Sequence, residues 1–150
     1  MEKLLIRLAE TSEKKELEAL QWRASLANPG DRDALLAHPD AIEVPIAQIA
    51  AGRMFVAELN QKVAGFAAVG PRADGESDLD ALFVDPPMQR RGIARLLVAH
   101  CAEFARSQDC AFLYVIGNPH AQDFYARCGF ITIGTSETRF GPGLLMRLPL

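Results

Sequence analysis

The segment from Leu82 to Arg95 constrains the fold of this chain more than any other stretch. An apolar run ends at Val84, two prolines follow at Pro86 and Pro87, and an apolar helical pattern begins near Ile93. Because proline has no amide hydrogen, a ladder of strand hydrogen bonds must end at this point. The segment therefore predicts a buried strand, a sharp exit and the first turn of a long helix.

The loop between this strand and this helix is short, basic and contains Gly92. The first amides of a helix have no intrahelical partner, and the helix dipole adds partial positive charge at the same end. Gly92 has no Cβ, so the backbone can come close to a ligand, and Ala94 is small enough to allow nearly the same. An anion with several acceptor oxygens is the expected occupant. A nucleotide-binding P-loop is excluded because no Lys-Ser/Thr pair follows the glycine.

Apolar periodicity and turn residues divide the remaining chain into strands and helices. We expect strands over residues 4–8, 53–59, 62–69, 77–84, 111–116, 130–133 and 144–148. The strands are joined by turns first and by helices later, which is typical of a mixed sheet. The predicted fold class is therefore α/β (mixed α+β), with a central sheet of six to seven strands and helices on both faces.

Five helical segments are expected around this sheet. The first has Thr11 or Ser12 as its N-cap and ends at the segment 28–30, and a short helical turn covers residues 31–38. A third helix has Pro45 at its first position, and the fourth runs from Ile93 to about residue 108. The fifth is predicted over 118–128, capped at its start by an Asn-Pro pair and followed by Gly129. Loops are expected over 70–75 and 138–143.

Composition limits the function classes that this chain can serve. Its 150 residues suit one domain covering 1–150, and the net charge of −3 argues against nucleic-acid partners. The three cysteines and three histidines lack metal-ligand spacing, so no metal site is expected. No signal-like segment or membrane-length apolar run is visible, so we expect a cytoplasmic protein with no membrane partner.

Two motifs resemble a known family. The loop Gln89-Arg90-Arg91-Gly92-Ile93-Ala94 resembles the Q/R-x-x-G-x-G/A signature of the GNAT-type N-acetyltransferases. The segment from Asn118 to Phe130 is similar to the N-x-x-A-x-x-x-Y-x-x-x-G-F pattern of the same family. The two motifs cover residues 82–130 together with the strand before the loop, and the rest of the chain agrees with the family only in the order of its elements.

The resemblance implies a GNAT-like fold and an N-acetyltransferase. The expected reaction moves an acetyl group from acetyl-CoA, the acyl-donor substrate, to a primary amine by direct attack on the thioester. The acceptor would be a small-molecule or peptide amine, and its identity and the preferred acyl length stay open. An alternative is a non-catalytic acyl-CoA-binding sensor or regulatory module of the same fold. Dimers are common in the family, so a homodimer through the C-terminal strands is a further option.

The family pattern also assigns roles to residues of this chain. The backbone of Phe83 and Val84 would pair with the pantetheine arm, Asn118 would hydrogen-bond it, and the Leu82 amide would face the thioester carbonyl. Tyr125 would lie near the sulfur as general acid. The pyrophosphate would be held by the loop and the first helical turn, mainly through backbone amides of Gln89, Arg90, Arg91, Gly92, Ile93, Ala94 and Arg95.

The general base is left between two carboxylates. Asp78 occupies the position of a strand glutamate found in many relatives, and Asp80 lies two residues on, so both point to one face of a strand. Two carboxylates so placed can raise each other's pKa and attract a cationic amine, or they can form a solvated strand edge. On the helix predicted over 118–128, Asn118 and Tyr125 share a face at positions i and i+7. This relation predicts that Phe124 and Cys128, on the opposite face, belong to the core.

Overall fold

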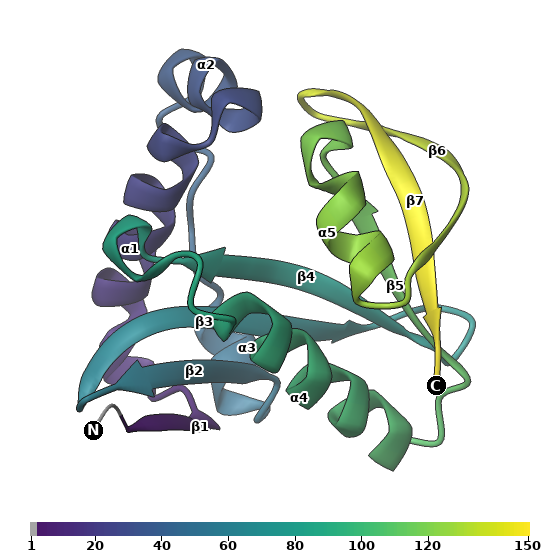
Figure 1. The fold of residues 1–150 in the computed structure, drawn as a ribbon, viewed down its shortest axis with the longest axis horizontal. Coiled ribbons are helices and arrows are strands. Elements are labelled where there is room, and N and C mark those ends of the chain that lie inside the picture. The colour runs from purple at the N-terminus through teal and green to yellow at the C-terminus, as the bar shows by residue number, and fades with distance from the viewer. Residues whose placement is uncertain (1–2) are drawn as a thin grey trace.

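The computed structural model describes residues 3–150, which form a seven-stranded mixed sheet with helices on both faces (Figure 1). The strands are β1 (Leu4–Leu8), β2 (Met54–Leu59), β3 (Lys62–Pro71), β4 (Ser77–Val84), β5 (Phe112–Gly117), β6 (Ile131–Thr138) and β7 (Gly141–Pro149). The α-helices are α1 (Lys14–Ala27), α2 (Pro29–Ala37), α3 (Ile46–Ala50), α4 (Ile93–Ser107) and α5 (Gln122–Arg127). Short 3₁₀ turns are η1 (Thr11–Glu13), η2 (Pro86–Met88) and η3 (Pro119–Ala121). The predicted fold class is confirmed.

The sheet has the strand order β1-β2-β3-β4-β5-β7-β6. Four strands form an antiparallel meander, and β5, β7 and β6 form a second antiparallel group. The two groups meet where β4 pairs with β5 in parallel, after the crossover through α4. A parallel pair needs such a crossover because its two strands run in the same direction.

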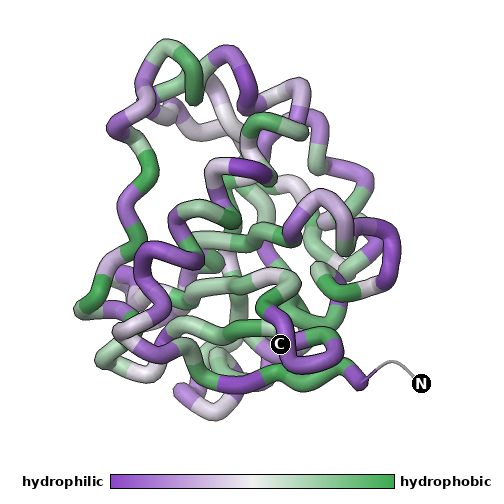
Figure 2. The backbone as a smooth tube through the Cα atoms, turned by 90° about the vertical axis from the view of Figure 1, so that its left-hand side faces the viewer, coloured by the Kyte–Doolittle hydropathy of each residue, from purple (hydrophilic) through white to green (hydrophobic). Residues whose placement is uncertain are grey.

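Strand β2 shows how the sheet separates two cores. Alternate side chains point to opposite faces of a strand, and both faces are buried here. Phe55 and Ala57 join the core under α4, whereas Met54 and Val56 join the core under α1 and α3. Figure 2 accordingly shows hydrophobic strands in the centre of the molecule and hydrophilic stretches mainly along its outer helices and turns.

The junction between β4 and β5 is short. Only Ser77 and Asp78 of β4 are in register with β5, opposite Leu113 and Tyr114. Beyond this point the strands diverge, so the two halves of the sheet open like a V (Figure 1). The rest of β4 has a neighbour on the β3 side only, which leaves one backbone edge of that segment without a strand partner.

Several predicted helix starts were wrong. The N-cap of η1 is Glu10, not Thr11 or Ser12, because the Glu13 carboxylate accepts a hydrogen bond from the Glu10 amide at 2.8 Å. The first helix ends at the expected segment, with Asn28 as its C-cap, but α2 begins there at once, with Asn28 as N-cap and proline at the first helical position, and not at residue 31. Pro45 is the N-cap of α3 and lies just before its first residue.

Two predicted loops are shorter than expected. Gly70 and Pro71 extend β3, where they pair with Asp78 and Ser77. The predicted loop over 138–143 is the tip of the β6–β7 hairpin, in which Gly141 already pairs with Thr138. Glycine and proline were taken as loop signals, but antiparallel pairing with a neighbouring strand overrode them. Strand β5, expected to be covered on both faces, also leaves Ile116 50% exposed.

Candidate active site

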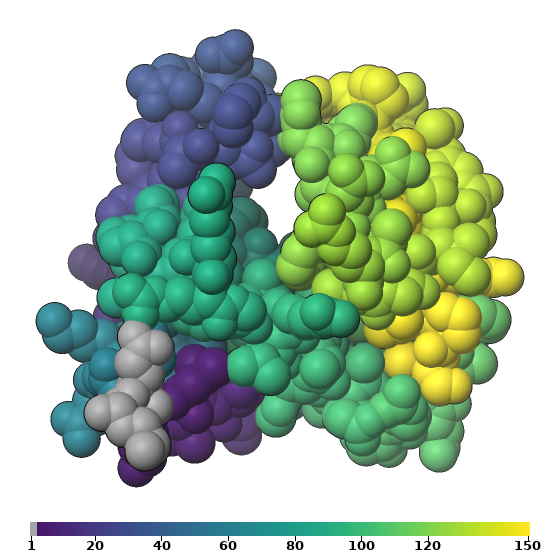
Figure 3. All heavy atoms as spheres, in the orientation of Figure 1, coloured from purple at the N-terminus to yellow at the C-terminus, as the bar shows by residue number. Residues whose placement is uncertain are grey.

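The divergence of β4 from β5 opens a cleft through the middle of the molecule, visible as a hollow in Figure 3. The cleft consists of two adjoining cavities. The loop-side cavity, of about 620 Å³, lies against the start of α4, and the α1-side cavity, of about 500 Å³, lies against α1 and α2. Both cavities are lined by Asn28, Leu82, Val84, Gln89, Ala121 and Tyr125. These six residues mark the passage between the two cavities.

The loop that begins α4 has an unusual backbone. Arg90 and Gly92 adopt positive φ angles of 65° and 79°, while Arg91 between them does not. Such alternation turns successive amides toward one side and forms an anion-binding concavity. Gly92 is the N-cap of α4, and a Cβ added there would meet nothing within 4 Å. Glycine at this position is therefore required by its left-handed backbone, and the space in front of it is open to a ligand.

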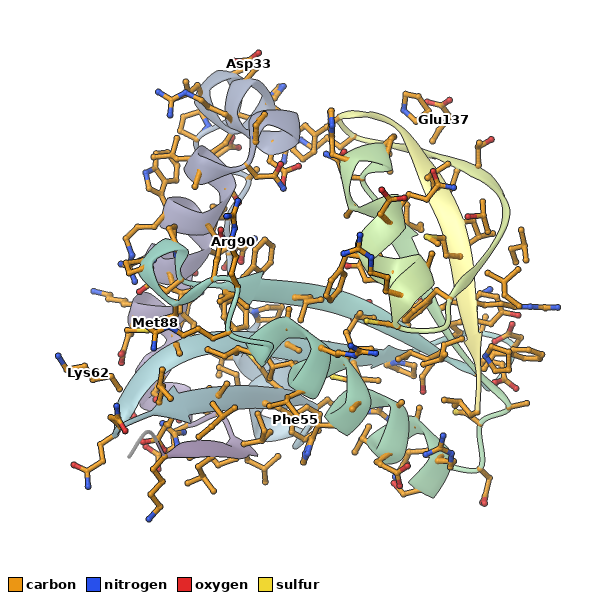
Figure 4. All side chains as sticks on the ribbon, in the orientation of Figure 1. Asp33, Phe55, Lys62, Met88, Arg90 and Glu137 are labelled. Atoms are coloured by element: carbon orange, nitrogen blue, oxygen red, sulfur yellow. The ribbon has the colours of Figure 1, made fainter. Side chains whose placement is uncertain are left out.

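The charged residues that line the loop-side cavity are all basic: Arg90, Arg95 and Arg127. Among residues 3–150 no carboxylate contributes to this lining. Figure 4 shows Arg90 rising from the loop beside the opening between the α1 side and the α5 side. The predicted residues Gln89, Gly92, Ile93 and Ala94 line the same cavity, whereas Arg91 does not. The basic side chains and the helix dipole favour a ligand of negative charge.

The open edge of β4 turns polar backbone groups into the cleft. The Asp85 amide donates to the Ala64 carbonyl at 2.8 Å, so alternate residues of β4 face β3. By this alternation Phe83 faces β3 as well, while Leu82 and Val84 face the cleft. The hydrogen bond that the Val84 carbonyl accepts from Gln89 Nε2 at 3.5 Å is consistent with this direction of the Val84 backbone. The expectation that the Phe83 backbone pairs with a ligand is therefore corrected, because its backbone groups face β3, although Phe83 is among the residues that line the α1-side cavity.

Tyr125 lies at the passage between the two cavities and is 9% exposed. Its ring packs edge-on against Phe124 and Phe130, with ring centroids 5.2 and 5.3 Å away. Gly117 of β5 makes room for it, because a Cβ there would lie 3.2 Å from the tyrosine ring. Burial, together with nearby Cys128 and Asp31, raises the pKa of Tyr125 to about 12. The phenol is therefore protonated at neutral pH and can act as a hydrogen-bond donor.

The two residues predicted to belong to the core, Phe124 and Cys128, do pack against it, but they are less buried than Tyr125. Phe124 and Cys128 are only partly buried and line the loop-side cavity, whereas Tyr125 is the buried residue of α5. The prediction treated α5 as a regular helix over its whole length. A 3₁₀ turn precedes it and changes the rotation of the following residues, so the i to i+7 relation does not hold.

The two candidate carboxylates of β4 have different surroundings. Asp78 Oδ1 accepts a hydrogen bond from Arg72 Nη1 at 3.0 Å, and Asp78 does not line the cleft. Asp80 lines the α1-side cavity and accepts from Gln48 Nε2 at 2.9 Å. A β-bulge beside it lets its carboxylate lie over Gly70, where a Cβ would collide with it.

The electrostatics of Asp80 suit a proton acceptor. Partial burial raises its pKa and the charge of Asp78 raises it further, whereas the hydrogen bond from Gln48 and the charge of Arg53 oppose the shift. Since a base works best when its pKa approaches the operating pH, this direction favours Asp80 over its ion-paired neighbour Asp78.

Asn118 connects the two sides of the cleft. Its Oδ1 accepts from the His120 amide at 2.9 Å, and its Nδ2 donates to Asp31 Oδ1 at 3.0 Å. Asp31 Oδ2 in turn accepts from Asn28 Nδ2 at 3.0 Å. Gly30 allows this approach, since a Cβ there would lie 2.6 Å from Asn118 Nδ2. The side chain predicted to bind a ligand thus caps η3 and bridges to α2.

Sequence reasoning missed Asp31 and Asn28 as residues of this site. An Asn-Pro pair opens a helix at residue 28 as it does at residue 118, and the second pair was interpreted correctly. Applying the same rule at Asn28 would have placed Asp31 in the first turn of α2. Its contact with Asn118, 87 residues away, has no local signal.

Two further observations concern sites of other kinds. Within residues 3–150, no group of three or more His, Cys, Asp or Glu side chains is arranged to hold a metal ion. The helices of the same part of the chain are all too short or too polar to span a membrane.

Comparisons with known proteins agree with this geometry. The family model described as "Acetyltransferase (GNAT) family" matches residues 5–130. A search of curated proteins gives no match. Many solved structures share the fold.

Three of these solved structures show the extent of the similarity. A GCN5-related N-acetyltransferase from Rhodopseudomonas palustris has a TM-score of 0.77 at 18% identity, covering 97% of this chain and 95% of the other. PaiA N-acetyltransferase from Thermoplasma acidophilum, in complex with coenzyme A, has a TM-score of 0.74 at 14% identity and covers 99% of both chains. YncA from Salmonella typhimurium, with its cofactor acetyl-CoA, has a TM-score of 0.72 at 20% identity, covering 99% and 94%. At these identities the similarity establishes the fold.

Proposed function

The chain belongs to the acetyltransferase (GNAT) family, and on this premise we propose that it transfers an acetyl group from acetyl-CoA to a primary amine. The observation that carries the proposal is one continuous cleft. It leads from the amides at the start of α4, along the open edge of β4, to the hydroxyl-bearing side chain of Tyr125 and the carboxylate of Asp80. PaiA and YncA were solved with coenzyme A and acetyl-CoA, which supports a coenzyme of this kind.

The residues of the cleft fit this coenzyme. The amides of residues 92–95 and the basic side chains Arg90, Arg95 and Arg127 would hold the pyrophosphate, and Gln89 lines the same cavity. The groups of Leu82 and Val84 on the open edge of β4 would pair with the pantetheine amides as an added strand would. When bound, acetyl-CoA supplies the acetyl group as a thioester and leaves as a thiol.

Asp80 would prepare the amine for attack. A free alkylamine with a pKa near 10.4 is mostly protonated at neutral pH and has no lone pair to offer. Asp80 would remove that proton through a water molecule, because an aspartate on the strand has limited reach. The nitrogen then forms a bond to the acetyl carbon, the carbon–sulfur bond breaks, and the Leu82 amide would stabilise the charge on the carbonyl oxygen.

Tyr125 would assist departure of the thiol. Its pKa of about 12 is above that of a thiol, about 8.5. Hydrogen-bond donation to the developing thiolate is therefore favoured over complete loss of the phenol proton, and the second proton released by the amine neutralises the thiolate through solvent. Tyr125 thus stabilises the leaving group without changing its own charge.

A thiol-release assay with a panel of primary amines tests the proposal when combined with calorimetry of acetyl-CoA binding. We expect micromolar to millimolar binding and amine-dependent thiol release in the presence of an acceptor. Binding without thiol release for every amine in the panel would favour the non-catalytic acyl-CoA sensor. The absence of binding would contradict both functions.

A further inference from the structure

Charges are segregated along the cleft. The loop-side cavity is lined by three arginines and no carboxylate, as described above. The α1-side cavity continues into an outer cavity of about 340 Å³ beside the β6–β7 hairpin and a rear cavity of about 240 Å³ beside α3. The charged residues that line these three cavities are Asp31, Asp80 and Glu43, and among residues 3–150 no lysine, arginine or histidine joins them.

Two of these carboxylates, Asp31 and Asp80, have no cation from residues 3–150 in direct contact, although the positive charge of Arg53 acts on Asp80. The Asp31 carboxylate accepts hydrogen bonds from the side-chain amides of Asn28 and Asn118. The Asp80 carboxylate accepts one from the side-chain amide of Gln48. In the described part of the chain neither carboxylate forms an ion pair. Glu43 contributes less, because its side chain is 82% exposed and lies 4.0 Å from Lys14. The α1-side cavity therefore offers two carboxylates that a cationic ligand can neutralise.

These carboxylates lie where the acceptor nitrogen must arrive. Asp31, Asp80 and Tyr125 all line the α1-side cavity, and the bond from Asn118 holds the Asp31 carboxylate at the end of β5. An amine placed between them would be attracted as an ammonium ion and would then face the passage to the loop-side cavity.

The outer cavity has a different character. Its walls are mainly apolar and come from α2, the loop after it, β4, β5 and the β6–β7 hairpin: Leu35, Ile42, Phe83, Ile116, Phe140 and Pro142. Ile116 and Phe140 are each 50% exposed, although both are large apolar side chains. Asp31 lines both this cavity and the α1-side cavity, so the acidic position and the apolar walls are continuous.

We propose that the acceptor is a primary amine carried on an apolar body and lacking a carboxylate, with its nitrogen between Asp31 and Asp80 and its body in the outer cavity. This inference rests on the proposed function. An amino acid acceptor would bring its α-carboxylate close to two like charges, and among residues 3–150 no basic residue lines the cavities around them. A polyamine would place a second ammonium against apolar walls, where desolvation opposes binding.

Matched acceptors test the proposal in the wild-type enzyme. Phenethylamine and phenylalanine differ only by the carboxylate, and phenylalanine methyl ester masks its charge. With rates corrected for the neutral fraction of each amine, we expect kcat/KM for phenethylamine and for the ester to exceed that for phenylalanine by about tenfold or more. An equal or higher value for phenylalanine would overturn the inference while leaving the acetyltransferase function intact. Thiol release with none of the three, although another amine of the panel is acetylated, would overturn the inference alone, whereas no release with any amine of the panel would overturn both.

A charge-inverting variant adds an independent readout. Phe140→Lys places a cation at the wall of the outer cavity, and Phe140→Gln is the uncharged control. We expect Phe140→Lys alone to raise the phenylalanine to phenethylamine ratio of kcat/KM by about tenfold, with coenzyme affinity and Tm unchanged. The same ratio in both variants would contradict an acceptor body in this cavity. Asp31→Asn keeps an oxygen for Asn118 and should raise the KM for phenethylamine; an unchanged KM would remove Asp31 from the acceptor site.

Discussion

The two sides of the cleft are built in opposite ways. The loop side uses backbone amides and an unusual sequence of φ angles within one short segment, together with three arginines. The acceptor side uses side chains from α1, α2, β4, β5 and the β6–β7 hairpin, with carboxylates as its charges. A common ligand such as acetyl-CoA can be held by a backbone that depends on few side chains. An acceptor that differs between proteins needs surfaces that substitutions can change.

Gly92→Glu should have the largest effect on coenzyme binding, because it strains the backbone of the loop that begins α4. The left-handed conformation costs a non-glycine residue about 1–2 kcal/mol, and the new carboxylate repels phosphate. We expect the Kd for acetyl-CoA to rise about 100-fold or more, as measured by calorimetry. Gly92→Ala separates strain from charge and should cause a smaller loss. Tight binding by the glutamate variant would reject the loop as the pyrophosphate site.

Tyr125→Phe should be the next largest effect, and it tests the passage between the two sides. Phenylalanine keeps the packing against Phe124 and Phe130 but has no hydroxyl to donate. We expect kcat to fall about 100-fold, as for the loss of one positioned hydrogen-bond donor to a developing negative charge, with little change in the Kd for acetyl-CoA. Unchanged turnover would remove Tyr125 from the chemistry.

Asp80→Asn should weaken the acceptor side without affecting the loop side. The carboxylate acts as a base only when ionised, so in the wild type kcat/KM should decrease as pH falls through its raised pKa. The variant should lose about tenfold or more in kcat/KM at neutral pH, and this acid limb should disappear from its profile. Asp78→Asn is the matched control. Asp78→Asn breaks the ion pair with Arg72, and the pH profile of this variant should retain the acid limb. If the acid limb disappears from the profile of Asp78→Asn, Asp78 is the base.

The same pair of variants should differ in stability. A carboxyl whose pKa is raised in the folded state stabilises the fold most at low pH, below the unfolded pKa of about 3.9, and this contribution is lost as pH rises through the folded value. At neutral pH the ionised Asp80 is therefore unfavourable for folding, and Asp80→Asn should melt at the same or a higher temperature. Asp78→Asn should be neutral or slightly destabilising, by about 0–1 kcal/mol, because its ion pair is partly exposed. A lower Tm for Asp80→Asn than for Asp78→Asn would contradict this assignment.

Arg127→Ala should have the smallest effect, since it removes one of three arginines that line the loop side. We expect the Kd for acetyl-CoA to rise a few-fold at low ionic strength, and the difference from wild type to shrink in salt. Affinity measured at two salt concentrations checks this. A loss as large as that of Gly92→Glu would show that side chains, not the backbone, dominate on this side.

The sequence predicts the loop side of the cleft better than the acceptor side. Strands Leu4–Leu8 and Ser77–Val84 were predicted with their observed bounds, and helix α4 begins at Ile93 as expected, because local turn residues define these ends. The loop motif is also local, so the sequence alone singles out its residues, and their binding role stays a prediction. The prediction from a regular strand placed Asp78 and Asp80 as equals, but a bulge gives only Asp80 a place in the cleft.

The acceptor side depends on contacts between distant segments. The bond between Asp31 and Asn118 spans 87 residues, and it exists because Gly30 lets α2 approach η3 closely. No periodicity or motif encodes such a contact. The sequence singled out Tyr125 but did not predict its burial, which depends on a 3₁₀ turn and on Gly117 of a different strand.

The central claim is that backbone amides at the start of α4 hold the coenzyme and direct its thioester to Tyr125. A crystal structure with acetyl-CoA tests this most directly. We predict pyrophosphate oxygens within hydrogen-bonding distance of the amides of residues 92–95, with the sulfur beside the Tyr125 hydroxyl and the acetyl group facing Asp80. Phosphates bound at any other place on the molecule would contradict the account.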